Sequence, residues 1–213
     1  MSSYLTTGAS HGLGLELTRR VAVSLSSEVS KIFAKIQGEA TSLQEVASKS
    51  PDSIVSIKLD VTSEISIKHA VAQVETQSDE KCLKLDHERP WCPLGHPSIS
   101  TTPSKGKCEE TRKRASLHTY ACYVQAIPAP AYNITNTTLD AFIVQYALEY
   151  EKEGFVIIAL SPGWLRTDLG GANADLSVEQ GAKGSLEKIF SAGKEQNGEF
   201  LKIAVEDLKE LEG

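Results

Sequence analysis

The sequence predicts an α/β fold built on a doubly wound parallel sheet. Three features favour it: strand-like segments alternate with helical spacing, a glycine-rich turn follows the first strand, and "FVIIAL" at 155–160 is a continuous apolar run. Strands that alternate with helices pair in parallel, and a strand covered on both faces is apolar throughout. We expect a single domain over residues 1–213, with an irregular segment at about 87–130.

The first strand and helix flank the glycine-rich turn. Residues 4–7 form a short strand that ends at Gly8. Apolar residues then recur every four positions, which indicates a helix with one apolar face. These residues are Leu13, Leu17, Val21 and Leu25.

The pattern repeats up to the middle of the chain. The next two strand segments are rich in Ile, Val and Phe, and the helix between them ends before Pro51, which disfavours helical geometry in the preceding residue. A hydroxyl side chain then caps the following helix. The expected strands are 29–36 and 53–61, and the expected helices are 39–49 and one that begins at Thr62 or Ser63.

The last third of the chain resumes the alternation. A helix that contains Tyr132 places Leu139, Ile143, Ala147 and Leu148 on one face and ends at Gly154. The expected elements are this helix to about Glu153, a strand at 155–160, a helix at 177–192 and a strand at 198–203.

The composition is that of an ordinary globular protein, with 40% hydrophobic and 23% charged residues. A formal net charge of −6 argues against nucleic acid or an anionic membrane as a partner. No apolar run approaches the ~20 residues that a membrane-spanning helix needs, and "MSSYLTTGAS" lacks the features of a secretory signal. We therefore expect a cytoplasmic protein that acts on a small molecule.

The turn "TGASHGLG" has the features of a nucleotide-binding loop. Gly8 permits the tight turn, Gly12 lets the backbone approach a pyrophosphate, and Gly14 lets the helix pack closely on the sheet. The helix N-terminus supplies N–H groups and a partial positive charge for a phosphate. Its place between a strand and a helix favours nucleotide binding over a merely flexible turn.

"TGASHGLG" and "KLDVTS" at 58–63 resemble the cofactor motifs of the short-chain dehydrogenase/reductase family, especially fungal ketoreductases of aromatic polyketide pathways. The resemblance covers about residues 4–86 and 128–203. It implies a Rossmann-like sheet with central elements missing or distorted, an NAD(P)-dependent oxidoreductase, and a homo-oligomer that pairs through the helix bearing Tyr132. The implied cofactor contacts are Gly8, Ser10, Gly12, Leu13, Gly14, Asp60, Tyr132, Leu165 and Thr167.

The choice between NAD and NADP depends on the end of the second strand. An acidic residue there binds the ribose hydroxyls of NAD, whereas a basic residue suits the extra phosphate of NADP. The segment "FAKIQGE" has Lys35 and no acid before Glu39, which favours NADP over NAD.

The resemblance makes Tyr132 the catalytic residue, which protonates the alkoxide in ketone reduction and acts in reverse in secondary-alcohol oxidation. In the family a lysine one helical turn later supports the tyrosine, but here that position is Asn136. Because a general acid or base contributes ~10²–10⁴-fold to a rate, the alternative is an impaired relative that binds a nucleotide or a partner without turnover.

The irregular segment leaves the catalytic serine unassigned. The family spacing places that residue at Thr119, Ser116 is the nearest serine, and residues 115–127 are a doubtful replacement for the expected strand. A sheet without its central strand exposes two edges. We also expect a strand at 81–86, after which the family's asparagine-rich loop is missing.

Cysteines and histidines also gather in this segment. Cys92 with His96, and His118 with Cys122, have spacings that tetrahedral zinc tolerates. The pairs lack a knuckle-like turn, so a solvated loop is the favoured interpretation and we expect no metal site.

Overall fold

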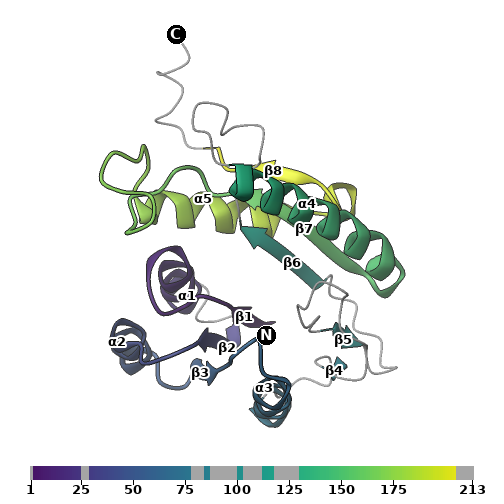
Figure 1. The fold of residues 1–213 in the computed structure, drawn as a ribbon. Coiled ribbons are helices and arrows are strands. Elements are labelled where there is room, and N and C mark those ends of the chain that lie inside the picture. The colour runs from purple at the N-terminus through teal and green to yellow at the C-terminus, as the bar shows by residue number, and fades with distance from the viewer. Residues whose placement is uncertain are drawn as a thin grey trace. The chain divides into compact units, whose positions relative to one another are not determined.

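The computed structural model describes residues 2–24, 29–77, 84–86, 100–102, 112–117 and 130–204 (Figure 1). The chain divides into two compact units, Met1–Cys108 and Glu109–Gly213. Each unit contains a parallel sheet of three strands with helices packed on it. The α/β class expected from the sequence is confirmed, whereas the grouping of the whole chain into one domain stays a prediction.

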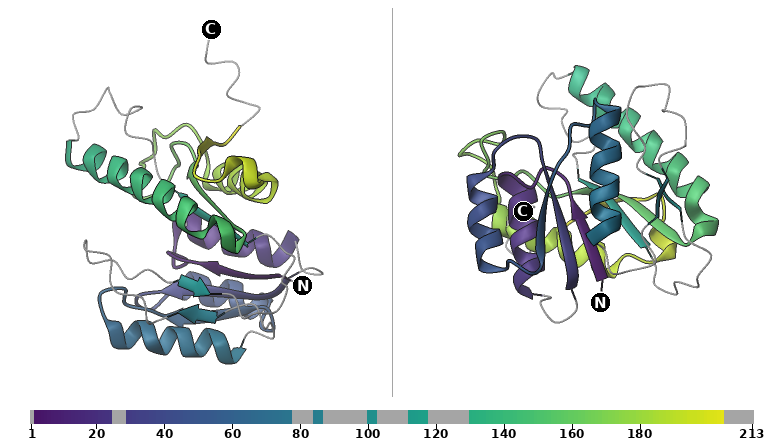
Figure 2. Two further views of the ribbon diagram at one scale, coloured as in Figure 1. Left: turned by 90° about the vertical axis from the view of Figure 1, so that its right-hand side faces the viewer. Right: turned by 90° about the horizontal axis from the view of Figure 1, so that it is seen from below.

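The first unit follows the predicted alternation closely. Its strands lie in the order β1-β2-β3, and Leu5 is in register with Phe33, which in turn pairs with Val55. Helices α1 and α2 cover one face of this sheet and α3 covers the other (Figures 1 and 2). The elements are β1 Ser2–Thr6, α1 Gly12–Ser24, β2 Val29–Ile36, α2 Thr41–Lys49, β3 Ile54–Lys58 and α3 Glu64–Gln77.

Local chemistry explains where these elements begin and end. The Oγ atom of Ser63 accepts a hydrogen bond from the Ser66 N–H at 3.3 Å, so Ser63 caps α3, one of the two expected capping residues. Strand β3 is shorter than the predicted 53–61 because the chain turns after Leu59. Leu25 lies outside the described residues. The core between the sheet and α3 comprises Phe33, Ile57, Leu59, Ala70, Val71 and Val74.

A small separate ladder follows the first sheet. Strand β4 (Lys84–Asp86) falls within the expected strand at 81–86, but it pairs antiparallel with β5 (Ser100–Thr102). Among the described strands no ladder joins β4 to β1. In the part of the chain that the structure describes, β1 is therefore an edge of its sheet, as expected where a central parallel strand is missing.

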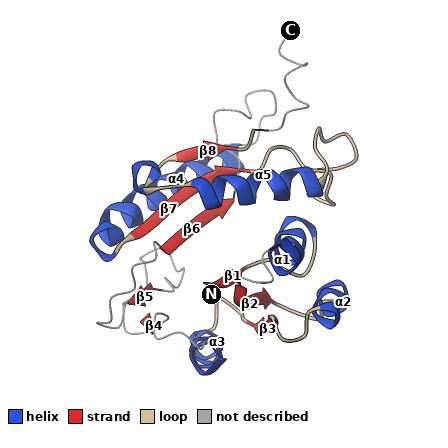
Figure 3. Cartoon of the chain, turned by 180° about the vertical axis from the view of Figure 1, so that it is seen from behind, coloured by secondary structure: helices blue, strands red, loops and turns tan. Residues whose placement is uncertain are grey.

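The second unit has the strand order β6-β7-β8. Alternate residues of β7 face opposite ways: Phe155, Ile157 and Ala159 pack with α4 residues, whereas Val156 and Ile158 pack with Ala192 after α5. Figure 3 shows α4 and α5 on opposite faces of this sheet. The elements are β6 Arg112–Leu117, α4 Pro130–Tyr150, the 3-10 turn η2 Glu151–Glu153, β7 Phe155–Ser161, α5 Val178–Ser191, η3 Lys194–Gln196 and β8 Phe200–Lys202.

Two expectations for this unit need correction. Residues 112–117 do form a parallel strand, β6, although the sequence made a strand near here doubtful. Basic residues at the start of a strand are unusual in a central strand and are typical of an edge strand. Leu148 is 63% exposed and does not join the buried face of α4, because Tyr150 and Tyr146 provide the aromatic contacts at that end.

Helix α4 stops close to where the sequence predicts. Three further residues, Glu151–Glu153, continue as a 3-10 turn, and Gly154 then adopts a φ of 80° that favours glycine. No helix among the described residues is both long and apolar enough to cross a membrane.

Candidate functional site

The glycine loop has a backbone that requires glycine at three positions. Gly8 has a φ of 68° and Gly12 a φ of 55°, a region that other residues rarely adopt. A Cβ atom on Gly14 would lie 2.3 Å from the carbonyl oxygen of Gly8, far inside van der Waals contact. The Ala9 N–H donates to the Lys35 carbonyl at 3.2 Å and ties the loop to the end of β2. The loop is therefore a fixed turn that brings the start of α1 close to the sheet.

The start of α1 is suited to an anion. First-turn N–H groups of a helix have no partner within the helix, and they carry a partial positive charge. The first turn of α1 contains no acidic residue that would compete with a bound phosphate. Ser10 and Leu13, the other expected contacts in this loop, flank the start of the helix and are partly exposed. This end of α1 can hold a phosphate.

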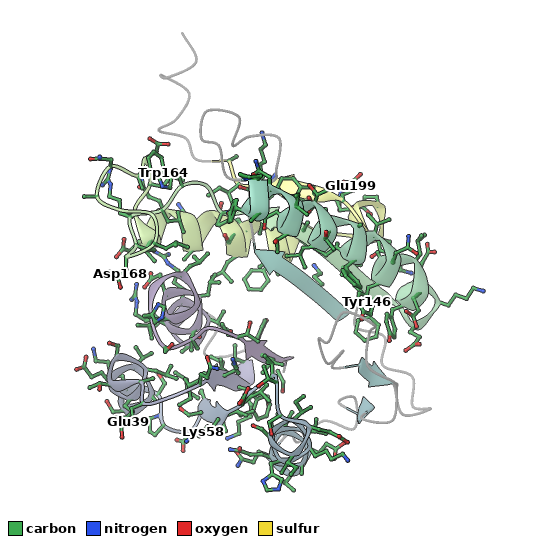
Figure 4. The ribbon with its side chains drawn as sticks, in the orientation of Figure 1. Glu39, Lys58, Tyr146, Trp164, Asp168 and Glu199 are labelled. Atoms are coloured by element: carbon green, nitrogen blue, oxygen red, sulfur yellow. The ribbon has the colours of Figure 1, made fainter. Side chains whose placement is uncertain are left out.

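Asp60 and Lys35 lie at the same edge of the first sheet as the glycine loop, because parallel strands share their carboxyl edge. The Asp60 Oδ1 atom accepts hydrogen bonds from the Thr62 hydroxyl at 2.7 Å and from the Thr62 N–H at 2.9 Å. These bonds, led by the hydroxyl and aided by the charge of Lys35, hold the pKa of Asp60 below its usual value. Glu39 is exposed before α2 (Figure 4). Asp60 is therefore a fixed, ionised acceptor with a cation nearby.

Tyr132 and Asn136 lie one turn apart near the start of α4, but they differ in burial. Tyr132 is 47% exposed and Asn136 only 7% exposed. The Asn136 Nδ2 atom is buried without a hydrogen-bond partner, and so is the Oδ1 atom of Asn133. Leaving such a group unpaired costs about 1–3 kcal/mol. Sequence reasoning missed Asn133, although its spacing of three from Asn136 places the two side chains next to each other on the helix.

The loop after β7 is closed by its own hydrogen bonds. Leu165 bridges to Leu176, and the Thr167 Oγ1 atom accepts from the Gly170 N–H at 3.0 Å. The Trp164 indole N–H donates to the Gly170 carbonyl at 2.9 Å, and Figure 4 shows Trp164 and Asp168 on this loop. Because the Thr167 hydroxyl accepts in its bond with Gly170, its own proton can be donated to a ligand.

The expected site residues thus form two groups, one in each unit. The glycine loop and Asp60 lie at the carboxyl edge of the first sheet, while Tyr132, Leu165 and Thr167 belong to the segments that flank β7 in the second unit.

The serine and zinc candidates lie largely beyond what is described. Ser116 is in register with Ala159 near the end of β6, whereas Thr119 lies outside the described residues. The zinc candidates Cys92, His96, His118 and Cys122 also lie outside them. Within the described ranges no three His, Cys, Asp or Glu side chains could together hold a metal ion.

Comparison with known proteins finds several relatives of the chain. No family model matches the chain. The C-signal protein of Myxococcus xanthus is 33% identical over 73 residues, which are 34% of this chain and 44% of that protein. The short-chain dehydrogenase/reductase atnB of an Arthrinium species is 24% identical over 205 residues, 79% of this chain and 76% of the relative. Norsolorinic acid ketoreductase of Dothistroma septosporum is 21% identical over 240 residues, which cover 94% of this chain and 89% of the relative.

Solved structures show the same fold. An NADPH-bound carbonyl reductase from chicken fatty liver matches with a TM-score of 0.74 and 23% identity, over 94% of this chain and 95% of its own. The carbonyl reductase Sniffer of D. melanogaster matches with a TM-score of 0.75 and 19% identity, over 95% of this chain and 96% of its own. The chain is therefore similar to short-chain dehydrogenases/reductases and carbonyl reductases, and it has their Rossmann-like α/β fold.

Proposed function

We propose that the chain is an NADP-dependent ketone reductase, which can also oxidise secondary alcohols in reverse. The observation that carries this proposal is the glycine loop. Gly8 and Gly12 have positive φ angles, and Gly14 touches the Gly8 carbonyl closely enough to exclude a side chain. Such a loop at the start of a helix leaves room for a pyrophosphate against the backbone. The residues therefore fit a dinucleotide.

The preference for NADP over NAD rests on Lys35. Its ammonium group lies near enough to Asp60 to help hold down the pKa of that carboxyl, so a positive charge is present at the carboxyl edge of the sheet. That charge suits the extra phosphate of NADP. The NADPH-bound state of the chicken carbonyl reductase supports the same choice.

The chemistry assigns roles to the second unit. A bound NADPH would supply the hydride for the carbonyl carbon. Tyr132, half exposed at the start of α4, donates its hydroxyl proton to the carbonyl oxygen as the carbon is reduced. The Leu165 backbone and the Thr167 hydroxyl hold the nicotinamide end. The name of the Dothistroma relative, a ketoreductase, supports a ketone as substrate. The sequence resemblance to fungal ketoreductases of aromatic polyketide pathways supports a role in secondary metabolism.

Titration of the purified protein with NADPH tests the cofactor site. We expect saturable binding, seen by nucleotide fluorescence and a rise in melting temperature, that is lost in Gly12→Val because valine is strained at a φ of 55°. Thr76→Ala is the control in the same unit, since the Thr76 hydroxyl bonds only carbonyls of its own helix, α3. A folded wild-type protein that fails to bind NADPH would refute the proposal.

A second candidate is a relative that binds the nucleotide with little turnover. Asn136 favours it, because a neutral amide stands where the family resemblance places a lysine, and α4 has no basic residue in its last turn either. If the missing charge limits the rate, Asn136→Lys should raise ketone reduction by at least about tenfold, since acid–base support contributes ~10²–10⁴-fold. Asn136→Gln, which adds length without charge, is the control. Equal rates of ketone reduction in wild type, Asn136→Lys and Asn136→Gln would show that the missing positive charge does not limit turnover.

A further inference from the structure

The turn between η3 and β8 contains an asparagine followed by a glycine. Of the four asparagines in the sequence, Asn197 alone precedes a glycine. Asn197 has a φ of −62° and a ψ of 122°, and Gly198 has a φ of 84°. These are the angles of a type II turn, which requires glycine at its second central position. The Glu199 N–H donates to the Gln196 carbonyl at 3.0 Å and closes the turn.

This turn is fastened to both β7 and α4. The Asn197 Oδ1 atom accepts from the Ile157 N–H at 2.8 Å, and the Asn197 Nδ2 atom donates to the Ala147 carbonyl at 3.0 Å. The Gly198 N–H donates to the Ile157 carbonyl at 2.8 Å. A Cβ atom on Gly198 would lie 3.4 Å from that of Ala147, so the turn packs directly on α4, and Figure 4 labels Glu199 at its end. Asn197 and Gly198 are only partly buried, so water reaches them.

An asparagine followed by glycine has a reaction of its own, because glycine carries no side chain to hinder attack by its nitrogen. That backbone nitrogen attacks the Cγ atom of the asparagine and forms a five-membered succinimide. The Cγ–Nδ2 bond breaks, and the side-chain amide leaves as ammonia with the proton of the glycine nitrogen. Water then opens the ring at either carbonyl, which gives aspartate or isoaspartate without oxidation or reduction.

The folded turn keeps the two reacting atoms apart. In a succinimide the glycine nitrogen lies on the same side of the Cα–C bond as Cβ, whereas a ψ of 122° turns it away from the Asn197 side chain. The hydrogen bond to Ile157 also holds the proton on the Gly198 nitrogen. Ring closure therefore requires the turn to leave Ile157 and Ala147, since backbone rotation and loss of the amide break its bonds to both.

The product of this reaction does not fit the contact with α4. An oxygen replaces Nδ2, so two acceptors face each other where the Asn197 donor and the Ala147 carbonyl were 3.0 Å apart. Leaving a charged group without its partner costs more than leaving a neutral one. Isoaspartate also lengthens the backbone of the turn by one carbon. Because the ammonia has left, refolding does not restore the amide.

We propose that Asn197 is a deamidation site that the native fold protects. The amide is lost only when the turn at 196–199 separates from α4 and β7, and the carboxylate that results weakens this contact. The modified residue therefore marks chains in which the contact has opened, and it leaves them less stable. The proposal is independent of the function proposed above, since none of these residues belongs to the candidate site.

The test follows deamidation of the full chain by peptide mass spectrometry and by isoaspartate-specific methylation. Wild type is incubated at mildly alkaline pH in buffer, in a series of sub-denaturing urea concentrations, and fully unfolded in urea. The peptide that contains Asn173, which is exposed and followed by alanine, is the internal control. Hydrogen exchange of the Gly198 N–H measures the opening of the turn independently.

We expect Asn197 to deamidate many times faster than Asn173 in the unfolded chain, because the glycine nitrogen is unhindered. In buffer the Asn197 rate should be at least about tenfold lower than in the unfolded chain, because several hydrogen bonds must break together. The same factor should protect the Gly198 N–H from exchange, since both processes need that group to leave Ile157. Deamidation and exchange should then rise together along the urea series.

Three variants test the contact itself. Tyr150→Ala removes a buried ring from the α4–β7 packing and should raise the native deamidation rate toward the unfolded rate. Thr135→Ala, which loses an exposed hydroxyl bonded to the Ala131 carbonyl, is the control on the same helix and should leave the rate unchanged. Asn197→Asp should melt at a lower temperature than wild type, whereas Asn173→Asp, the same charge change in an exposed loop, should not. If Tyr150→Ala does not fold, the urea series makes the same comparison.

Other results overturn the proposal. Equal Asn197 rates in native and unfolded protein would show that the fold does not protect the site. An unfolded rate no faster than that of Asn173 would show that the site does not exist. A native rate that is unchanged by sub-denaturing urea would separate deamidation from this contact. An Asn197→Asp protein as stable as wild type would show that the contact tolerates the carboxylate.

Discussion

At Gly14 the space that a side chain would need is taken by the Gly8 carbonyl oxygen, so this position can hold only glycine without a shift of the loop. Asp60 is fixed in a comparable way by its hydrogen bonds to Thr62. Asn136 is the opposite case, because its Nδ2 atom is buried and unpaired. Single residues thus define both a fixed glycine loop and an unsatisfied donor, and the proposed cofactor site rests on the first of these features.

The Thr62 hydroxyl is expected to set the titration of Asp60. Removing it with Thr62→Ala should raise the pKa of Asp60 toward the ordinary 3.8, because this bond is the largest cause of the lowered value. A carboxyl whose pKa is lower in the folded than in the unfolded protein stabilises the fold at pH values above its unfolded pKa. This stabilisation is lost as the pH falls through the pKa of the folded state. Acid unfolding below about pH 4 should therefore begin at a higher pH in the variant.

Carbon-detected NMR titration of the Asp60 carboxyl measures that shift directly. Thr76→Ala is a suitable control, since the Thr76 hydroxyl bonds only carbonyls of its own helix. An unchanged Asp60 titration in Thr62→Ala would show that the Thr62 backbone N–H and the charge of Lys35 are sufficient to keep the pKa of Asp60 low.

Helix α4 and strand β7 are joined by more than apolar packing. Ile143, Ala147 and Tyr150 pack on Phe155 and its neighbours in β7. The Asn197 side chain adds a polar link, since its amide bonds the backbone of both elements. The position of Tyr132 along the sheet follows from this contact, because the helix is held at its far end.

We expect Asn197→Ala to lower the free energy of unfolding by about 1–3 kcal/mol, because it leaves the buried Ile157 N–H without an acceptor. Urea denaturation measures the change. Asn173→Ala, in an exposed loop, should remain within about 0.5 kcal/mol of wild type. Equal stabilities of the two variants would mean that the apolar contacts alone hold α4.

The outward face of α4 bears on the oligomeric state. Ile134, Val144 and Leu148 are 67%, 42% and 63% exposed and lie on one side of the helix, away from β7. If the chain pairs through this helix, as the family resemblance implies, Leu148→Glu should convert a dimer into a monomer. Sedimentation velocity decides this, with Glu149→Gln, also exposed, as the control. A monomeric wild type would exclude the interface.

At the scale of the whole molecule, each of the two units contains its own parallel sheet of three described strands. Their strand orders are β1-β2-β3 and β6-β7-β8, and β1 and β6 each pair with one neighbour among the described strands. Cooperative unfolding of such a chain depends on whether the units Met1–Cys108 and Glu109–Gly213 behave as one domain.

NADPH provides the test of the single-domain prediction. A ligand at about 100 times its Kd stabilises the fold by about 2.7 kcal/mol. If the chain is one domain, calorimetry should show a single transition that moves upward as a whole. If the units unfold independently, two transitions should appear, and NADPH should shift only the one that contains its binding residues.

Much of the fold follows from local pattern. The apolar run at 155–160 predicted β7, because a strand that is covered on both faces has apolar side chains on both. The strand predicted at 29–36 coincides with β2. Gly8, Gly12 and Gly14 predicted the loop, because their freedom at positive φ is a property of the residue itself.

The remaining features needed the tertiary structure. The basic segment 112–117 becomes β6 only because β7 offers it hydrogen-bond partners, and a basic start carries no strand signal of its own. Leu148 is exposed because Tyr146 and Tyr150 complete the aromatic packing instead. The burial of Asn136 could not be read from its type or spacing, since burial is set by what packs over a residue. The sequence by itself determined the class of fold and the glycine loop, because both follow from local residue pattern, while tertiary packing decided which polar groups of α4 are buried without a partner.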